Sequence, residues 1–404
     1  MNDNHCQSIT TDQELLDYCQ QLASTEYLAF DTEFLSGNTY RSYLCLVQVA
    51  TAEGIALIDP LDIVDMTPFW KILCEGDHQT IVHAGREELR FCLQATGQLP
   101  KNLFDIQLAA PFIGMEHPAA YQNLVNKVLG IEISKGETRT DWSRRPLSKG
   151  QLEYALQDVL YLKEITEHFE QRLEELDRTS WFQDEVEAWK EELCHTETEG
   201  RWRKVSGTAS FNRRSLEVVR RLWLWREGLA ERFDRPPKKI LRDDLIAELA
   251  RRRITSLKKI EEVRGVAHGL SRSQLAEIPA IIKKANDCPI DLCPHVLRKE
   301  NSRHITLLAQ LITTAIHTTC REQQITPSIV SSTQDVRDLI SYHLAKGKPS
   351  KKPSMATGWR AKLVGNLVEE MLQGKIAIRI QNPHSESPLS FETVSQPPKN
   401  GKPS

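Results

Sequence analysis

One stretch near the N-terminus constrains this chain more than any other, the eight residues 27–34 with the sequence Tyr-Leu-Ala-Phe-Asp-Thr-Glu-Phe. Its apolar residues predict a buried strand that ends in two acids, Asp31 and Glu33. Successive side chains of a strand point to opposite faces, so these two carboxylates share one face of the sheet. Two carboxylates in a partly buried place repel each other, and a bound cation is the usual remedy. An isolated Asp-x-Glu is also typical of a solvated strand end, so the interpretation depends on partners elsewhere.

The length of 404 residues predicts two or three domains, and 40% apolar with 26% charged residues is the balance of a water-soluble globular protein. No apolar run is long enough to span a bilayer, and the first residues lack the character of a signal peptide. Nine cysteines without regular spacing favour reduced thiols over a disulfide framework. We therefore expect a cytoplasmic protein that does not contact a membrane.

The net charge of −3 hides a strong asymmetry along the chain. Residues 201–280 contain 20 Lys and Arg against 10 Asp and Glu, whereas the rest of the chain contains 32 against 45. A basic segment beside an acidic remainder suggests a module that binds a polyanion, attached to a module rich in carboxylates.

Hydrophobic patterning predicts a mixed sheet flanked by helices in the first 175 residues. The predicted strands cover 27–34, 43–50, 55–60, 80–83 and 103–105, and the predicted helices cover 11–22, 69–73, 86–95, 106–113 and 121–129, with a long helix from 148 past 173. The acidic stretch 187–199 suits a linker. Short helices follow in the basic segment and again over about 305–380, and the end of the chain, rich in Ser, Pro, Lys and Gly, should be disordered.

Three further residues complete a pattern with Asp31 and Glu33. Glu88 begins a helix shortly after His-Ala-Gly, and Tyr154 and Asp158 are four apart on a later helix, so they share one face. This order of motifs resembles the DEDDy group of 3′–5′ exonucleases, and the flanking text is most similar to the ribonuclease D family. The similar segments are Phe-Asp-Thr-Glu-Phe at 30–34, Thr-Tyr at 39–40, Leu-Ile-Asp-Pro at 57–60, Thr-Arg-Thr-Asp-Trp at 138–142 and Arg-Pro-Leu-Ser at 145–148.

The resemblance implies a ribonuclease H-like α/β exonuclease domain, a mixed sheet flanked by helices, followed by two all-α accessory domains. The expected boundaries are 8–180 for the exonuclease domain, 181–207 for an acidic linker, 208–288 for a helicase-and-RNase-D C-terminal (HRDC) domain, 295–382 for a second HRDC-like domain and 383–404 for a disordered tail. The implied activity is 3′–5′ exoribonuclease trimming of structured RNA, most plausibly tRNA precursors, with release of nucleoside 5′-monophosphates.

The resemblance also implies two divalent ions per active site, Mg²⁺ or Mn²⁺. Four carboxylates without Cys or His form the oxygen ligand set that such hard ions prefer. By resemblance, Asp31 would bridge both ions, Glu33 and Asp158 would hold the one that activates water, and Glu88 would support the second. Tyr154 would orient the attacking water.

Glu88 departs from the family pattern, in which an Asp stands at this position. Glutamate keeps the charge but extends the carboxylate by one methylene, so the second ion would sit differently or bind through water. This departure leaves open a noncatalytic RNA-binding protein with a degenerate metal site. Asp105 is a possible stand-in for the missing Asp, although a structural role is the favoured interpretation of that residue. A DNA 3′–5′ exonuclease is the other alternative, because it would use the same acids.

The basic segment supplies candidates for phosphate contacts. Arg251, Arg252, Arg253, Lys258 and Lys259 are concentrated there, and we expect them to hold RNA while its single-stranded 3′ end enters the acid cluster. We expect a monomer.

Overall fold

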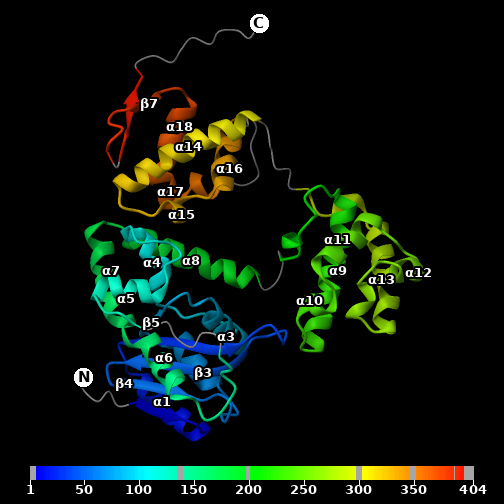
Figure 1. The fold of residues 1–404 in the computed structure, drawn as a ribbon, viewed down its shortest axis with the longest axis horizontal. Coiled ribbons are helices and arrows are strands. Elements are labelled where there is room, and N and C mark those ends of the chain that lie inside the picture. Colours follow the sequence, from blue (N-terminus) through cyan, green and yellow to red (C-terminus); the bar gives the residue numbers. More distant parts are fainter. Residues whose placement is uncertain are drawn as a thin grey trace.

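The computed structural model describes residues 6–133, 140–196, 201–296, 303–344, 352–385 and 387–394. Within them the chain forms a body built on a six-stranded sheet, a helical module beside it and a C-terminal domain of helices with a two-stranded hairpin (Figure 1). The predicted Thr-Arg-Thr-Asp-Trp segment lies partly outside the described residues, which resume at Thr140. No helix among the described residues is both long and apolar enough to cross a membrane.

The sheet of the body is mixed, as the sequence predicts. Its strands are β1 (Cys6–Ile9), β2 (Tyr27–Leu35), β3 (Tyr43–Thr51), β4 (Gly54–Ile58), β5 (Gln79–Val82) and β6 (Leu103–Asp105), in the spatial order β1-β4-β3-β2-β5-β6. The β2-β3-β4 part is antiparallel, and the other pairs are parallel. The sequence gives no sign of β1, because only Ile9 of its four residues is buried and the strand forms an edge beside β4.

Nine helical segments complete the described part of the body: α1 (Asp12–Leu22), α2 (Thr67–Glu75), α3 (Arg86–Thr96), α4 (Ile106–Ala109), η1 (Ala110–Ile113), α5 (Tyr121–Leu129), α6 (Lys149–Leu160), α7 (Leu162–Glu175) and α8 (Thr179–Thr196). Capping boxes begin α1 at Thr11 and α6 at Ser148. The long helix predicted from 148 past 173 is in fact two helices, because the chain leaves helical geometry at Tyr161.

The predicted acidic linker at 181–207 is wrong for its first part, which forms α8. Phe182, Val186 and Leu193 are buried in the core of the body, although acidic residues surround them in the sequence. These three residues recur at helical spacing, so one apolar face packs inward while the acids face water. The many acidic residues between these three positions made the helix look like a linker in the sequence.

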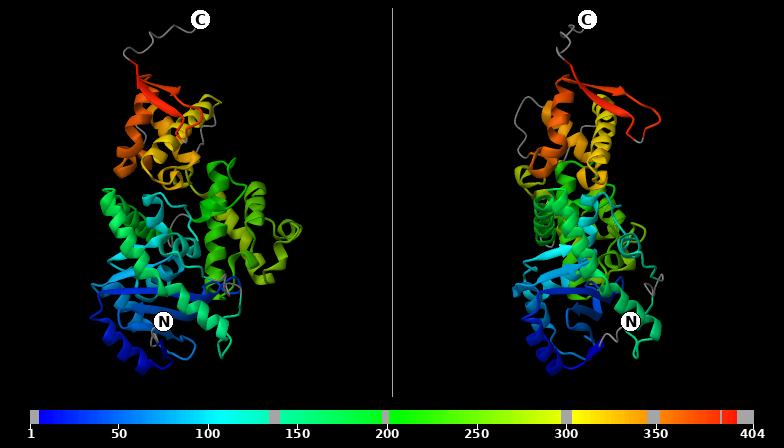
Figure 2. Two further views of the ribbon diagram at one scale, coloured as in Figure 1. Left: turned by 60° about the vertical axis from the view of Figure 1, so that its left-hand side comes forward. Right: turned by 90° about the vertical axis from the view of Figure 1, so that its left-hand side faces the viewer.

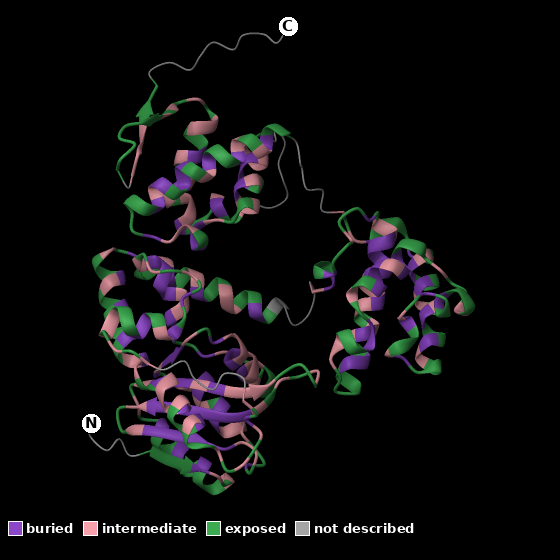
Figure 3. Ribbon diagram, in the orientation of Figure 1, coloured by how far each residue is buried: buried purple, intermediate pink, exposed green. Residues whose placement is uncertain are grey.

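The helical module that follows has a hydrophobic core of its own, separate from that of the body (Figure 3). It consists of η2 (Arg201–Lys204), α9 (Arg213–Arg232), α10 (Pro237–Ile240), α11 (Asp243–Arg252), α12 (Leu257–Glu261), η3 (Val266–His268), α13 (Arg272–Asp287) and η4 (Ile290–Leu292). The long helices α9 and α13 pack against each other at its centre.

The C-terminal domain, by contrast, shares one continuous core with the body. Its elements are α14 (Arg303–Glu322), α15 (Pro327–Val330), α16 (Thr333–Leu344), η5 (Ser354–Ala356), α17 (Gly358–Arg360), the π-helical turn η6 (Ala361–Gly365), α18 (Asn366–Leu372) and the strands β7 (Ile376–Ile380) and β8 (Leu389–Thr393). In both views of Figure 2 this domain lies at the end of the body opposite α1.

The hairpin β7-β8 corrects two predictions. Helix was expected up to about residue 380 and disorder from 383, but 376–380 and 389–393 pair as antiparallel strands. The pairing sets Ile378 opposite Phe391 and Ile380 opposite Leu389, so alternating apolar residues support strands within a polar segment.

Candidate active site

Asp31 and Glu33 lie on β2 where that strand extends past its neighbour. The pairing of β2 with β5 ends at Ala29 and Ile81, while β2 remains paired with β3 on its other side. The carboxylates therefore lie beyond the end of β5, where helices can approach them. A bulge between Glu33 and Phe34 marks the end of the regular register with β3.

Helix α6 brings Asp158 to the same place. One carboxylate oxygen from each of Asp31, Glu33 and Asp158 lies within 4.8 Å of the other two. Tyr154, one turn earlier on α6, hydrogen-bonds to Asp158. The four-residue spacing predicted that Tyr154 and Asp158 share one face of the helix, and both do lie beside the acids of β2.

Glu88 approaches the cluster from the start of α3. Its side chain is buried, and its Oε1 accepts a hydrogen bond of 2.5 Å from the hydroxyl of Thr32. The adjacent Glu87 faces the other way, paired with Arg90 and accepting a hydrogen bond of 3.2 Å from Ser42. Of the two neighbouring glutamates, the structure therefore directs only Glu88 toward Asp31.

The acids of the cluster raise one another's pKa. Burial, followed by the charges of Asp31, Asp158 and Glu88, raises the pKa of Glu33 to about 9. Burial and the charge of Asp31 raise the pKa of Glu88 to about 8, and burial raises that of Asp158 to about 7. Burial and the charge of Asp158 also raise the pKa of Asp31 well above its usual range. Such mutual repulsion shows that a cation would stabilise the ionised cluster.

Two buried polar groups near Asp31 and Glu33 lack hydrogen-bond partners among the described residues. One is Oδ2 of Asp158, and the other is the side-chain amide of Gln48, which pairs in register with Asp31 and so points to the same face. An unpaired carboxylate oxygen in a protein interior is costly unless something binds it. The orphaned oxygen of Asp158 therefore fits a site that is made for a divalent cation.

Asp105 is a structural residue and does not stand in for a metal ligand. Its carboxylate caps α4 and also accepts hydrogen bonds from the backbone amides of Ala84 (3.1 Å) and Gly85 (3.0 Å). Ala84 has a left-handed φ of 56°, so Asp105 stabilises the strained turn from which α3 begins. The nearby His83 donates from Nε2 to the carbonyl of Ala119 at 2.9 Å.

Sequence reasoning missed the contacts of Arg145 and Trp142, which fasten the segment before α6 to the rest of the body. Arg145 forms two hydrogen bonds with the carboxylate of Asp59 and also donates to the carbonyl oxygens of Cys45 and Trp142. Trp142 is buried with its ring 6.1 Å from that of Tyr154. Both residues belong to the segments that resemble the ribonuclease D family, which was the available signal, but their long-range partners have no local signature.

A cleft of about 860 Å³ separates the body from the helical module. From the body it is lined by residues that include Tyr40, Arg41 and Glu87, and from the module by Trp223 and several cations. Those cations are Arg201, Lys204, Arg226, Lys238 and Lys239. Glu87 at the start of α3 thus lines the cleft, whereas its neighbour Glu88 is directed to the acid cluster.

The five predicted phosphate-binding residues do not line this cleft. Arg251, Arg252, Arg253, Lys258 and Lys259 are exposed on and around α11 and α12 of the module. Two of them are already engaged, since Arg251 and Arg252 both pair with Glu248. The structure thus gathers the five predicted catalytic residues in one place and leaves the five basic candidates on a separate surface.

Comparison with known families agrees with this arrangement. Residues 6–174 match a 3′–5′ exonuclease family, residues 215–282 match the HRDC domain, and residues 307–368 match the C-terminal HRDC domain of ribonuclease D. The fold and the acidic site thus define a 3′–5′ exonuclease, a class that generally uses divalent metal ions.

Curated relatives are similar over almost the whole chain. Ribonuclease D of Acidiphilium cryptum is 30% identical over 376 residues, which cover 92% of this chain and 94% of the relative. Ribonuclease D of Bartonella henselae is 29% identical over 92% of this chain and 91% of the relative. The crystal structure of Escherichia coli RNase D, an exoribonuclease involved in structured RNA processing, superposes with a TM-score of 0.77 at 28% identity, covering 91% of this chain and 99% of that one. The chain belongs to the ribonuclease D family and is a 3′–5′ exoribonuclease.

Proposed function

We propose that this exoribonuclease trims the 3′ ends of structured RNA, tRNA precursors in particular, with Asp31, Glu33, Glu88, Asp158 and Tyr154 as its catalytic residues. The observation that carries the proposal is the convergence of three carboxylates within 4.8 Å beside the buried Glu88. The structured substrate is suggested by the E. coli relative, whose involvement is in structured RNA processing. The cytoplasmic location and the monomeric state that the sequence suggests stay predictions.

The residues present suit two divalent cations, Mg²⁺ or Mn²⁺. Asp31, Glu33, Glu88 and Asp158 offer only carboxylate oxygens, the ligands that both ions accept. When bound, two such ions supply positive charge that stabilises the attacking and the leaving oxygen of a phosphodiester. The oxygen of Asp158 without a hydrogen-bond partner would then be satisfied.

Tyr154 has a positioning role for the attacking water. Burial and the neighbouring carboxylates raise the pKa of its hydroxyl, so the proton stays on the oxygen at neutral pH. That hydroxyl hydrogen-bonds to Asp158, and we expect it also to hold the water in line with the last phosphodiester. Attack of the water oxygen on phosphorus breaks the bond to the 3′ oxygen of the penultimate nucleotide. A nucleoside 5′-monophosphate is released, and the 3′ oxygen takes up a proton to leave a 3′ hydroxyl.

We infer that the hydrogen bond from Thr32 lets a glutamate take the place of the family's aspartate at position 88. It engages Oε1 and so fixes the longer side chain, which leaves Oε2 as the oxygen available for an ion. A glutamate oriented in this way keeps a ligand oxygen near Asp31, which supports a working site in preference to a degenerate one.

The cleft beside the cluster is a suitable path for the 3′ end of the substrate. Seven cations and four acids line it, and most of these cations come from the helical module, whereas the catalytic acids come from the body. We expect the phosphates of the single-stranded end to contact the cleft and the RNA body to contact the module, where Arg251–Arg253, Lys258 and Lys259 remain candidates.

A time course with a 5′-labelled tRNA precursor that carries a 3′ trailer tests this proposal. With Mg²⁺ or Mn²⁺ the wild type should give a ladder that shortens from the 3′ end. Asp31→Asn should abolish the ladder, and Glu88→Gln should slow it by roughly a hundredfold. Glu87→Gln is the matched control, because it removes a neighbouring charge outside the cluster and should leave most activity.

A DNA oligonucleotide of the same sequence completes the experiment. Equal trimming of the DNA would contradict the preference for RNA, since a ribonuclease should distinguish the two by the 2′-hydroxyl. Tight binding of the precursor without shortening under either metal would contradict the catalytic assignment of the five residues.

A further inference from the structure

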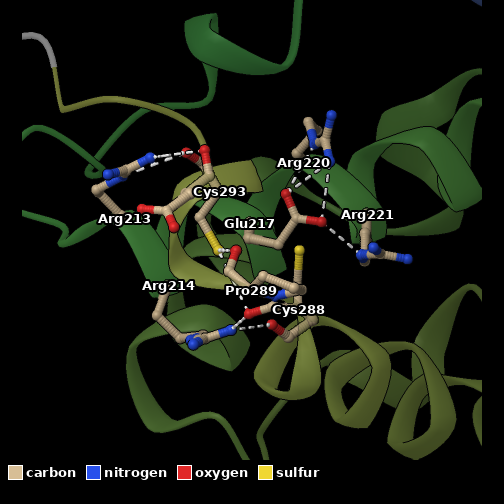
Figure 4. Close-up of polar contacts among 10 residues, drawn as sticks. Arg213, Arg214, Glu217, Arg220, Arg221, Cys288, Pro289 and Cys293 are labelled. Atoms are coloured by element: carbon tan, nitrogen blue, oxygen red, sulfur yellow. Dashed lines mark hydrogen bonds and ion pairs between the residues drawn. The ribbon is translucent and has the colours of Figure 1, made fainter.

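Helix α9 of the helical module carries a buried carboxylate held between two arginines (Figure 4). The side chain of Glu217 is fully buried. Arg220 binds it with Nε at 2.8 Å and Nη2 at 2.9 Å, and Arg221 binds it with Nε at 2.6 Å. One negative charge thus faces two positive charges, and the group keeps a net charge of +1.

Stability alone does not account for such a group. Removing a carboxylate from water is costly, and apolar side chains of similar volume stabilise a protein interior as well or better. What the carboxylate does provide is orientation, because it fixes the direction of two long side chains that would otherwise be mobile. Arginines held in this way lose little conformational freedom when they bind an anion.

The outward edges of both guanidinium groups remain available. Nη1 of Arg220 and both terminal nitrogens of Arg221 have no hydrogen-bond partner among the described residues, and the two side chains are 37% and 35% exposed. Arg213 and Arg214 in the same view differ, since their guanidinium groups donate to backbone carbonyls such as those of Cys293 and Ala285. Arg214 thus anchors the end of α13 and Arg213 the segment that follows it, whereas Arg220 and Arg221 present free donors.

A third cation lies beside this pair. Arg203 belongs to η2, which packs against α9. Its guanidinium lies over the ring of Trp202, 4.4 Å from the ring centre, and is exposed, with Nη1 donating to the carbonyl of His295 at 3.3 Å. Its pKa is lowered by burial and then by the charge of Arg220, so the two guanidinium groups are close enough to repel each other. Like charges that are kept together by packing form an attractive place for a polyanion.

The position of the pair connects it with the cleft. Residues 220, 223, 227 and 231 follow one face of α9, and the last three of them line the cleft. Arg201 and Lys204, which flank Arg203 on η2, line it as well. The ten residue steps from Arg221 to Glu231 rise by about 15 Å along the helix, the length of a few nucleotides of extended RNA.

We propose that Arg203, Arg220 and Arg221 form a phosphate-binding patch that receives the RNA backbone where it leaves the cleft. This inference rests on the proposed entry of the RNA 3′ end through that cleft. Arginine suits the role because its planar group offers paired N–H donors to phosphate oxygens. The patch is distinct from the basic residues of α11 and α12.

RNA binding measured without catalysis tests the patch. Fluorescence anisotropy in EDTA would compare wild type, Arg221→Gln and the control Arg272→Gln, using a stem-loop with a single-stranded 3′ extension of about 12 nucleotides. Arg272 is an exposed arginine at the start of α13, the end of that helix remote from Cys288. Arg221→Gln should weaken binding about three- to tenfold and reduce the slope of log affinity against log salt by roughly 0.7–0.9, while Arg272→Gln should change neither. Equal behaviour of the two variants would overturn the proposal.

Glu217→Gln provides a sharper test because two explanations predict opposite results. The change adds one net positive charge, so simple attraction predicts tighter RNA binding. The patch predicts weaker binding, because the arginines lose the carboxylate that orients them. Tighter binding by a variant that melts like the wild type would overturn the oriented patch, and Arg221→Gln decides the matter if Glu217→Gln does not fold.

A short substrate separates this inference from the proposed function. We expect a single-stranded RNA of four nucleotides to occupy the acids without engaging Arg221, so Arg221→Gln should trim it at the wild-type rate. If the wild type trims no RNA, the proposed function fails, while the anisotropy still decides whether the patch binds phosphate. Equal competition by a polyglutamate peptide would show a general anion site and overturn the assignment to RNA phosphate.

Discussion

The two helical domains that follow the exonuclease body are attached to it in opposite ways. The C-terminal domain shares a continuous apolar core with the body, whereas the helical module at 201–296 has its own core and faces the body across a cleft. Both are similar to HRDC domains, so the difference lies in their contacts and not in their type. A shared core makes one cooperative unit, while a polar contact leaves two units free to move.

Aromatic rings and a buried arginine join the C-terminal domain to the body. The ring of Trp359 is 5.1 Å from that of Phe112 and stacks on Trp181 at 5.6 Å. Arg178, also buried, donates to the carbonyl oxygens of Phe112 and of the turn after α14. Such contacts require both surfaces to be dry, so the two parts should unfold together.

Apart from Tyr40, whose side chain packs against the core of the module, the module contacts the body through exposed polar groups. Arg41 pairs with Glu231 at 2.8 Å, with both side chains more than half exposed, and the amide of Tyr40 donates to Asp234 at 3.0 Å. Lys239 donates to Asn38 at 3.1 Å. Contacts of this kind are weak and easily exchanged with water, which suits a module that must admit and release RNA.

Of the changes that test this comparison, Trp359→Ala should have the largest effect on stability. It removes a large buried ring from the shared core and should lower the free energy of unfolding by about 3–5 kcal/mol. Urea unfolding followed by circular dichroism measures the change. Leu307→Ala on the exposed face of α14 is the control and should stay within about 0.5 kcal/mol. A loss below 1 kcal/mol for Trp359→Ala would contradict the shared core.

Metal binding should stabilise the shared unit and leave the module unchanged. Glu33, Glu88 and Asp158 have pKa values raised to about 9, 8 and 7, above the ordinary carboxyl value near 4. The folded chain thus holds these protons more tightly than the unfolded chain, so without metal its stability falls as pH rises from about 4 to about 9. A cation competes with the same protons, and its stabilising effect should therefore grow over that window.

Calorimetry with and without Mg²⁺ at pH 6 and pH 9 checks this prediction. An ion at a hundred times its Kd adds about 2.7 kcal/mol, so the transition of the shared unit should move upward, more at pH 9 than at pH 6. The transition of the module should not move. Asp31→Asn is the control that should remove the shift, and an equal shift at both pH values would contradict the raised pKa values.

The ion pair between Arg41 and Glu231 should give the smallest effect. A double-mutant cycle with Arg41→Ala and Glu231→Ala should yield a coupling of about 0.2–1 kcal/mol that declines with salt. The exposed pair of Arg242 and Asp244, which lies within the module, is a matched control for exposure. Coupling above about 2 kcal/mol would show that the module is attached firmly.

Much of the body could be predicted from local patterns. The helix at 121–129 has the predicted bounds, and the strand of Asp31 and Glu33 appears as expected. The errors fall where local and tertiary signals compete. Acid-rich 181–196 is a buried helix because three apolar residues recur on one face, and polar 389–393 is a strand because β7 lies beside it.

The candidate site likewise has a part that local sequence patterns predict and a part that they do not. Period and spacing place Asp31 with Glu33 and Tyr154 with Asp158, so those pairs can be read from the sequence. The bond from Thr32 to Glu88 joins residues 56 apart, and that from Arg145 to Asp59 joins residues 86 apart. No local pattern encodes such contacts. The family resemblance selected Glu88 over Glu87, and the folded chain shows the contacts that direct Glu88 to the cluster.

The central claim is that four carboxylates form one site for two divalent ions, and counting bound Mn²⁺ by electron paramagnetic resonance tests it most directly. We predict two ions per chain for the wild type and for Glu87→Gln, and one for Glu88→Gln, in which Asp31, Glu33 and Asp158 remain. A single ion in the wild type, or two in Glu88→Gln, would contradict the account.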